Sequence, residues 1–144
     1  MSISAAVRLL QSAGLKATPQ RLLVLDALRQ LSHPDVDAIF RHAVAHHAGL
    51  SLATVYHVLE KFEQAGLIVQ LEFNGRRYYD IRRDAHDHVR CRRCGRLDDV
   101  NRDPRTHLVF TPGSAWVVES QSLLWEGVCP DCQASTMSRE ADTP

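Results

Sequence analysis

The chain has 144 residues, 44% of them hydrophobic and 24% charged, which is typical of one globular domain or two small ones. The 17 basic residues balance the 17 acidic residues, so bulk charge cannot drive nucleic-acid binding, although a local basic patch is compatible with this balance. No stretch approaches the roughly 18 apolar residues of a membrane span, and residues 1–10 lack the apolar run of a signal peptide. We therefore expect a cytoplasmic protein that contacts no membrane.

The first half of the sequence predicts four helices. A short amphipathic segment spans residues 4–12, and Thr18 then caps a second helix with a buried stripe over residues 22–31. Asp35, after a proline, begins a third helix, and Ser51 caps a fourth. The apolar positions of the fourth helix, which we expect to face inward, are Leu52, Val55, Leu59 and Phe62.

The apolar period changes after Gly66. Residues 68–73 and 76–81 flank an Asn-Gly dipeptide, which is typical of a two-residue hairpin. Two helices joined by a short turn and followed by a hairpin predict a winged helix-turn-helix. We therefore assign residues 1–82 to a winged-helix DNA-binding domain.

Residues 83–144 are expected to form a second, metal-binding domain. Its β-branched segment 115–128 predicts two strands, whereas 102–115 contains two prolines and supports no helix. The predicted class is α+β, with a small α/β domain built on a three-stranded sheet. The tail after about residue 134 is expected to be disordered.

A helix that enters the major groove buries one face and presents small or polar side chains on the other. In the fourth helix Ala53, His57 and Glu60 face outward, with Tyr56 at the edge. The alternative is that Tyr56 belongs to the core and that the hairpin arginines are merely solvated. Residues 1–72 hold six basic and six acidic residues, so affinity would depend on where the charges lie. The candidate DNA contacts are Lys16, Tyr56, His57, Arg76 and Arg77.

The four cysteines form two C-x-x-C pairs, separated by 34 residues. Two residues between cysteines let both thiolates reach one ion, and two such pairs complete a tetrahedral zinc site. The competing interpretations are disulfides, which a cytosolic location disfavours, and a redox-active pair, which four matched cysteines disfavour. We predict structural Zn²⁺ bound by Cys91, Cys94, Cys129 and Cys132.

His86 and His88 suggest a second metal site. Residues i and i+2 of a strand share a face, so both imidazoles can reach one ion. The alternative is that they are ordinary surface histidines. Asp80, Asp99 and His33 are further candidates, but spacing alone does not recruit them. A nitrogen and oxygen donor set suits Fe²⁺ or Mn²⁺.

Several motifs occur in order: G-L-K-A-T-P-Q-R at 14–21, S-L-A-T-V-Y at 51–56, A-G-L at 65–67, H-D-H at 86–88 and C-x-x-C-G at 91–95. Together they resemble the ferric uptake regulator (Fur) family of metal-dependent bacterial repressors. The resemblance implies an N-terminal winged-helix domain, a C-terminal dimerisation domain, a homodimer and a palindromic DNA operator. It also implies a structural zinc site at the four cysteines. The regulatory site that it implies between the domains consists of His33, Asp80, His86, His88 and Asp99.

Aspartate at both carboxylate positions is similar to the peroxide-sensing PerR branch of the family, whereas iron-responsive members usually carry Glu there. The resemblance implies that bound Fe²⁺ reduces peroxide, that a ligand imidazole (His33 or His86) is oxidised, and that the repressor then releases DNA. Mn²⁺ would repress without sensing. The alternative within the family is a regulator of iron, manganese or zinc uptake that ignores peroxide.

Two departures from the family concern the recognition helix and a third metal site. His57 replaces the Arg or Asn that many members carry in the recognition helix, and Ala85 and Gln121 replace two ligands of a third metal site, so we predict no third site. A zinc hydrolase using His86, His88 and Asp99 is the rival from another class. It lacks a placed base or nucleophile, so we expect a regulator and not an enzyme.

Overall fold

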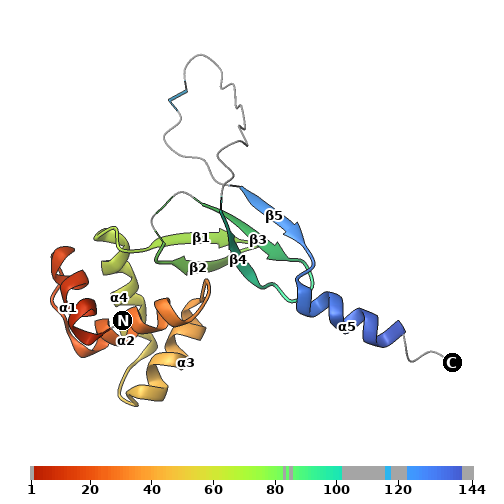
Figure 1. Cartoon of the computed structure of the whole chain (residues 1–144). Coiled ribbons are helices and arrows are strands. Elements are labelled where there is room, and N and C mark those ends of the chain that lie inside the picture. The colour runs from red at the N-terminus through yellow and green to blue at the C-terminus, as the bar shows by residue number, and fades with distance from the viewer. Residues whose placement is uncertain (1, 83, 85, 102–115, 118–122, 141–144) are drawn as a thin grey trace. The chain divides into compact units, whose positions relative to one another are not determined.

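The computed structural model describes residues 2–82, 84, 86–101, 116–117 and 123–140. The chain divides into two compact units, residues 1–83 and 84–144. Figure 1 labels the elements of both. None of the helices within the described ranges is long and apolar enough to cross a membrane. The predicted 102–115 loop, the first part of the predicted 115–128 strands, and Ala85 and Gln121 lie outside these ranges.

The N-terminal unit begins with four helices whose starts follow from their capping residues. The side chains of Thr18, Asp35 and Ser51 each accept a hydrogen bond from the backbone N–H three residues later, at 3.4, 2.8 and 3.1 Å. Each side chain thereby satisfies one N–H that has no partner within the helix. The helices are α1 (Ile3–Ser12), α2 (Pro19–Gln30), α3 (Val36–His46) and α4 (Leu52–Gln64).

The four helices share one hydrophobic core, and burying each large side chain contributes about 1.5–3 kcal/mol. Leu52 is an exception to the predicted inward stripe of α4, because 37% of it is exposed. It is the first residue of α4, and the buried stripe begins one turn later at Val55. The side chains with almost no exposure are Leu10, Val24, Leu25, Ile39, Val55, Leu59 and Phe62.

A hairpin follows α4. Strands β1 (Val69–Phe73) and β2 (Arg76–Asp80) pair antiparallel, and Phe73 lies opposite Arg76. Asn74 and Gly75 between them have φ values of 52° and 72°, the left-handed pair that a two-residue turn of this twist requires. The sequence prediction of a winged helix-turn-helix is therefore confirmed in its elements.

The C-terminal unit contains a three-stranded sheet of order β4-β3-β5. Strand β3 (Asp87–Cys91) is central, with β4 (Leu97–Val100) antiparallel to it and β5 (Leu124–Gly127) parallel to it. The predicted α+β class with a small three-stranded sheet is confirmed.

Helix α5 (Pro130–Glu140) ends the described chain. It continues past residue 134, where the sequence predicted a disordered tail. Pro130 suits the first helical position, the Gln133 N–H donates to the Cys129 carbonyl at 3.0 Å, and the Ser135 hydroxyl donates to the Asp131 carbonyl at 2.9 Å. These bonds complete a first turn that the weak apolar periodicity of the segment did not reveal.

Candidate metal centres and DNA-binding face

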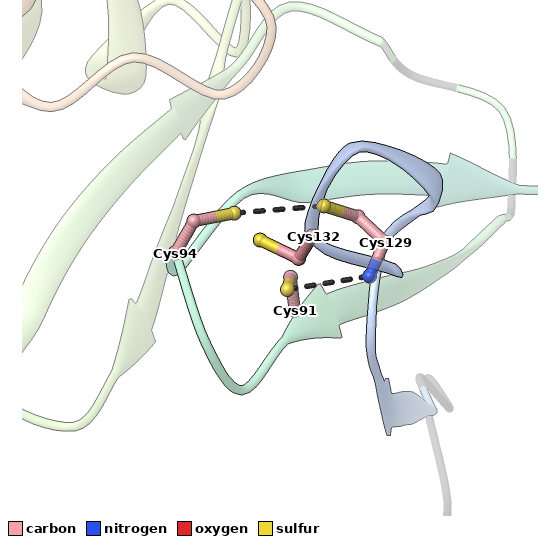
Figure 2. A group of neighbouring side chains, drawn as sticks. All are labelled: Cys91, Cys94, Cys129 and Cys132. Atoms are coloured by element: carbon pink, nitrogen blue, oxygen red, sulfur yellow. Dashed lines mark hydrogen bonds between the residues drawn. The ribbon is translucent and has the colours of Figure 1, made fainter. Parts of the chain in front are cut away.

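The four cysteine side chains of the C-terminal unit converge on one point (Figure 2). Their sulfur atoms all lie within 4.8 Å of one another, and Cys94 Sγ is 3.7 Å from Cys129 Sγ. Thiolates bound at about 2.3 Å to one tetrahedral Zn²⁺ lie about 3.8 Å apart. None of the four cysteines forms a disulfide bond. The donor set therefore fits a closed, four-thiolate zinc site better than paired disulfides.

The sheet and one tight turn create this convergence. Cys91 is the last residue of β3 and lies opposite Gly127 in the parallel register. Cys129 follows Gly127 by only two residues, so it lies near Cys91. Within the first pair, the Gly95 N–H donates to the Cys91 carbonyl at 2.9 Å. Gly95 has a φ of 77°, which favours glycine and turns the chain back toward β3 directly after Cys94.

Hydrogen bonds distinguish the thiols from one another. The Cys129 N–H donates to Cys91 Sγ at 3.3 Å and, with the backbone N–H of Cys94, lowers the pKa of Cys91 to about 6. Hydrogen bonds with the side chains of Cys129 and Cys94, followed by desolvation, raise the pKa of Cys132 to about 12. A divalent cation at the centre would stabilise the thiolate form of all four side chains, which is a second reason that the four residues fit zinc.

Two arginines that the sequence analysis did not single out brace the cysteines. The Arg96 guanidinium lies 2.8 Å from an Asp98 oxygen and 2.9 Å from an Asp131 oxygen, so it links β4 to the first turn of α5. Arg93 donates to the carbonyl of Cys132 at 3.0 Å. No sequence signal separates these two arginines from the others near the cysteines, because the contacts that link them to α5 join residues 35 or more positions apart.

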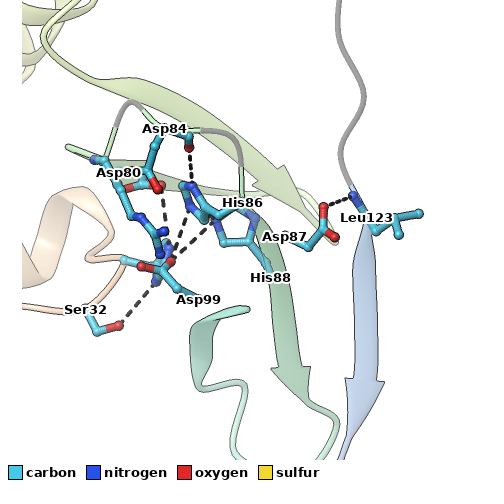
Figure 3. Close-up of polar contacts among 10 residues, drawn as sticks. Ser32, Asp80, Asp84, His86, Asp87, His88, Asp99 and Leu123 are labelled. Carbon is cyan, nitrogen blue, oxygen red and sulfur yellow. Dashed lines mark hydrogen bonds and ion pairs between the residues drawn. The ribbon is translucent and has the colours of Figure 1, made fainter. Parts of the chain in front are cut away.

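A second cluster lies on β3 and β4 of the same unit. His86 Nε2 is 3.1 Å from His88 Nε2 and 3.4 Å from Asp99 Oδ1, and His88 Nε2 is 3.9 Å from the same oxygen (Figure 3). Two ligands bound at about 2.1 Å to one ion lie about 3.0–3.4 Å apart. Both imidazoles are buried, whereas Asp99 retains 34% side-chain exposure. The three donors fit a single cation.

Local structure explains why these three side chains meet. The antiparallel register pairs His88 with Asp99, and His86 precedes His88 by two residues, so it lies on the same face. The Nδ1 atom of His86 is 2.7 Å from the Asp84 carbonyl oxygen (Figure 3). An Nδ1–H bond to a carbonyl leaves Nε2 with a lone pair for a metal.

Asp87 lies between the two histidines but has a different role. Its Oδ1 accepts a hydrogen bond from the Leu123 N–H at 3.2 Å, and only 5% of the residue is exposed (Figure 3). Leu123 directly precedes β5, and its carbonyl accepts from the His88 N–H at 3.0 Å. Asp87 thus fastens β5 to β3, a role that the H-D-H motif alone does not indicate.

The N-terminal unit holds a separate histidine and carboxylate pair. His33 Nε2 is 3.8 Å from Asp80 Oδ2, and both residues are only 8% exposed. Ser32 Oγ is 3.2 Å from the Nδ1 of His33, and the Arg82 N–H donates to the other oxygen of Asp80 at 2.7 Å. His33 has a φ of 42°, an uncommon conformation for a residue other than glycine. The family resemblance implies that this pair binds the same ion as the His86 cluster.

The predicted DNA-contacting residues of α4 lie on its solvent-facing side. Tyr56 is 47% exposed, which contradicts the alternative that it is a core residue. The His57 side chain is 65% exposed, and its Nδ1 lies 3.9 Å from Glu60. Lys16 is exposed ahead of α2, and its carbonyl accepts from Arg21 at 2.9 Å.

The wing arginines border a hollow of about 380 Å³ at the start of α3. Arg76 and Arg77 both line it, together with Tyr56 from α4. Two carboxylates line it as well, and the Arg76 side chain is paired with one of them, Asp35, at 3.2 Å. The sequence analysis recognised Asp35 as a helix cap but missed this second contact.

Comparison with known proteins identifies relatives over most of the chain. The model of the ferric uptake regulator family matches residues 12–108. The ferric uptake regulation protein of Bordetella parapertussis is 35% identical over 131 residues, which cover 86% of this chain and 94% of that protein. The structure of the Campylobacter jejuni peroxide stress regulator is 27% identical with a TM-score of 0.62, covering 92% of this chain and all of that one. The iron-bound ferric uptake regulator of Francisella tularensis is 26% identical with a TM-score of 0.63, covering 83% and 96%.

Proposed function

The chain belongs to the ferric uptake regulator family, metal-responsive transcriptional regulators rather than enzymes, and on this basis we propose that it is a repressor that senses peroxide through an iron-binding histidine. The observation that carries the proposal is a donor set of imidazoles and aspartates, all buried except Asp99, with no thiolate among the regulatory ligands. Such a set suits Fe²⁺ and Mn²⁺ and leaves the cysteines to a structural ion.

Zn²⁺ would occupy the four-cysteine site in this proposal. The site joins the end of β3 to the start of α5, so zinc would hold the C-terminal unit together rather than report on the environment. The sulfur spacing and the all-sulfur donor set support this assignment.

The regulatory ion would be held by both units. His86, His88 and Asp99 supply three ligands from the C-terminal unit, and His33 and Asp80 supply two from the N-terminal unit. An ion bound by both sets fixes the angle between the units and therefore the spacing of two recognition helices in a dimer. A symmetric dimer needs those helices about 34 Å apart, or a multiple of this distance, to read two half-sites of a palindrome.

The sensing step concerns the imidazoles. Fe²⁺, when bound, would give an electron that cleaves hydrogen peroxide and would regain one from the imidazole, so that the iron is unchanged overall. In the net reaction a ring carbon of His33 or His86 exchanges its C–H bond for a bond to oxygen, the peroxide O–O bond breaks, and the second oxygen leaves as water. The oxidised ring binds metal poorly, so the two units are released from each other. The Campylobacter jejuni relative and the two aspartates support this assignment over an uptake regulator.

The dimer would use the exposed edge of the C-terminal sheet. Within the described residues β5 pairs with β3 along one edge, and its large apolar side chains Leu124 and Trp125 are 40% and 52% exposed. Exposed apolar edge strands are typical sites of strand pairing between chains. A second copy of this chain, pairing there about a two-fold axis, would extend the sheet.

The experiment begins with duplexes selected from a random library by the Zn²⁺-loaded protein in the presence of Mn²⁺. Binding of the recovered duplex is then measured anaerobically with Fe²⁺ or Mn²⁺, before and after micromolar peroxide, alongside the intact mass. We expect peroxide to abolish binding only in the Fe²⁺ form, with one added oxygen atom on His33 or His86. His33→Ala should retain zinc but lose metal-dependent binding, and retention of that binding would refute the composite site.

The second candidate is a metal-uptake regulator that does not sense peroxide. The ferric uptake regulation protein of Bordetella parapertussis, at 35% identity, favours it. In this case the Fe²⁺ form keeps both its DNA affinity and its mass after peroxide, and removal of one particular metal releases the DNA. The same assay therefore separates the two candidates.

A further inference from the structure

The segment before α3 contacts strand β2 at its first residue and at its last two residues. The contacts all lie within the N-terminal unit, and they run from the wing turn to the end of the strand. They are, in order, Arg76 NH2 to Asp35 Oδ2 at 3.2 Å, the Tyr79 N–H to the Pro34 carbonyl at 3.0 Å, and Asp80 Oδ2 to His33 Nε2 at 3.8 Å.

Asp35 makes two different contacts with its two carboxylate oxygens. Oδ1 caps α3 by accepting from the Ala38 N–H at 2.8 Å, and Oδ2 accepts from the Arg76 guanidinium. The Asp35 side chain is 21% exposed, whereas that of Arg76 is 67% exposed. A guanidinium has five N–H donors in a rigid plane. Asp35 can therefore hold one edge of Arg76 while other donors face solvent.

We propose that Asp35 is a positioning residue for DNA binding, which holds the wing arginine Arg76 in an extended, outward orientation before DNA arrives. The proposal rests on the proposed DNA-binding function. Capping of α3 occupies only one carboxylate oxygen of Asp35. The second oxygen is therefore available to hold Arg76. The partner of Arg76 would be a phosphate of the DNA backbone beside the wing.

Two effects of Asp35 on affinity oppose each other. Its negative charge repels phosphate, so charge alone predicts that its removal tightens DNA binding. Fixing a long side chain in advance avoids an ordering cost of about 0.5–1.5 kcal/mol on binding, which corresponds to about two- to twelve-fold in affinity. The positioning role therefore predicts weaker DNA binding when the carboxylate is lost, whereas charge alone predicts tighter binding.

Asp35→Asn and Asp37→Asn form a matched pair. Asparagine caps helices as well as aspartate does, so Asp35→Asn preserves α3 while losing the charged partner of Arg76. Asp37 lines the same hollow and carries the same charge, on the first turn of α3. With the selected duplex and Mn²⁺-loaded protein, we expect Asp35→Asn to weaken binding about two- to twelve-fold and Asp37→Asn not to weaken it.

A double-mutant cycle with Arg76→Ala tests whether Asp35 acts through the arginine. Arg76→Ala should weaken binding and reduce the slope of log affinity against log salt by about 1, the value of one phosphate contact. In that background Asp35→Asn should weaken binding no further. Additive effects of the two changes, or tighter binding by Asp35→Asn alone, would overturn the proposal.

A second measurement needs neither DNA nor metal. Relaxation of the Arg76 Nε–H signal in the free protein should report a more mobile side chain in Asp35→Asn than in the wild type or Asp37→Asn. If the mobility of Arg76 were the same in Asp35→Asn as in the wild type, the positioning role would be refuted, whatever the DNA affinity of the variant. Conversely, if the wild type selected no duplex from the library, the proposed function would be refuted. The measured effect of Asp35 on the mobility of Arg76 would still hold.

Discussion

Asp87 provides the sharpest test of how the C-terminal unit is built. Its carboxylate accepts from the Leu123 N–H, and the Leu123 carbonyl accepts from the N–H of His88. Both backbone polar groups of Leu123 therefore bond to residues of β3. We predict that Asp87→Ala destabilises the C-terminal unit, that Asp87→Asn does so much less, and that neither variant changes the number of metal ions bound.

The size of the effect follows from burial. A hydrogen bond to a charged acceptor contributes about 1.5–3 kcal/mol, and water cannot easily replace an acceptor that is 5% exposed. Asp87→Ala should therefore cost about 2 kcal/mol. Asparagine retains a carbonyl oxygen at the same place, so its cost should stay below about 1 kcal/mol. With a urea m-value of about 1–2 kcal/mol/M, the alanine variant should unfold about 1–2 M earlier.

Tryptophan fluorescence makes the measurement specific to one unit, because Trp116 and Trp125 both lie in residues 84–144 and are the only tryptophans of the chain. Urea unfolding of the zinc-loaded proteins gives the free energies, and elemental analysis gives zinc and manganese per chain. If both variants unfold alike and both lose one equivalent of metal, Asp87 is a metal ligand and the anchoring role is wrong.

Three further predictions concern other contacts. Arg96→Met should release zinc to a chelator several-fold faster than the wild type, because Arg96 links β4 to the helix that carries Cys132. Arg92→Met, in the same turn, should release zinc at the wild-type rate. Equal rates in the two variants would show that Arg96 does not stabilise the zinc site. Trp125→Arg should convert a dimer to monomers in sedimentation velocity, since it places a charge on the exposed edge of β5, and an intact dimer would move the interface elsewhere. The hydrogen bond from His42 lowers the pKa of Asp26, so the stabilisation from this pair is present above the ordinary carboxyl pKa of 3.8 and disappears as pH falls through the lower folded value. Asp26→Asn should therefore unfold at lower urea than the wild type at pH 5, and the two should converge at acid pH; an equal gap at both would contradict the assignment.

The elements of the N-terminal unit were predictable because their signals are local. Thr18, Asp35 and Ser51 cap helices through bonds that span three residues, and Asn74-Gly75 determines its own turn. Leu52 was placed wrongly because periodicity gives a direction around the helix and not the depth of the core beneath it. Burial at a helix end depends on neighbouring elements.

For the metal clusters, spacing was informative only along one strand or one turn. It paired His86 with His88 and predicted both cysteine pairs, but not the register that sets Asp99 opposite His88 or Gly127 opposite Cys91. Register depends on the whole sheet, so Asp99 was a candidate that only the family resemblance assigned to the site. The second oxygen of Asp35, the Arg96 brace and the anchoring role of Asp87 had no signal, since each is a contact between residues 35 or more positions apart.

The position of the N-terminal ligand pair explains how a small ion can act on DNA recognition under the proposed function. Asp80 is the last residue of β2, and Arg76, at the other end of the same five-residue strand, lies in the wing. His33 is held next to Asp80, in an uncommon backbone conformation, by the segment that Asp35 and Pro34 fasten to this strand. A rigid strand transmits a displacement from one end to the other with little loss, whereas a loop would absorb it. An ion bound by Asp80 and His33 would therefore act directly on the element that presents the wing, and the loss of one imidazole would remove that action.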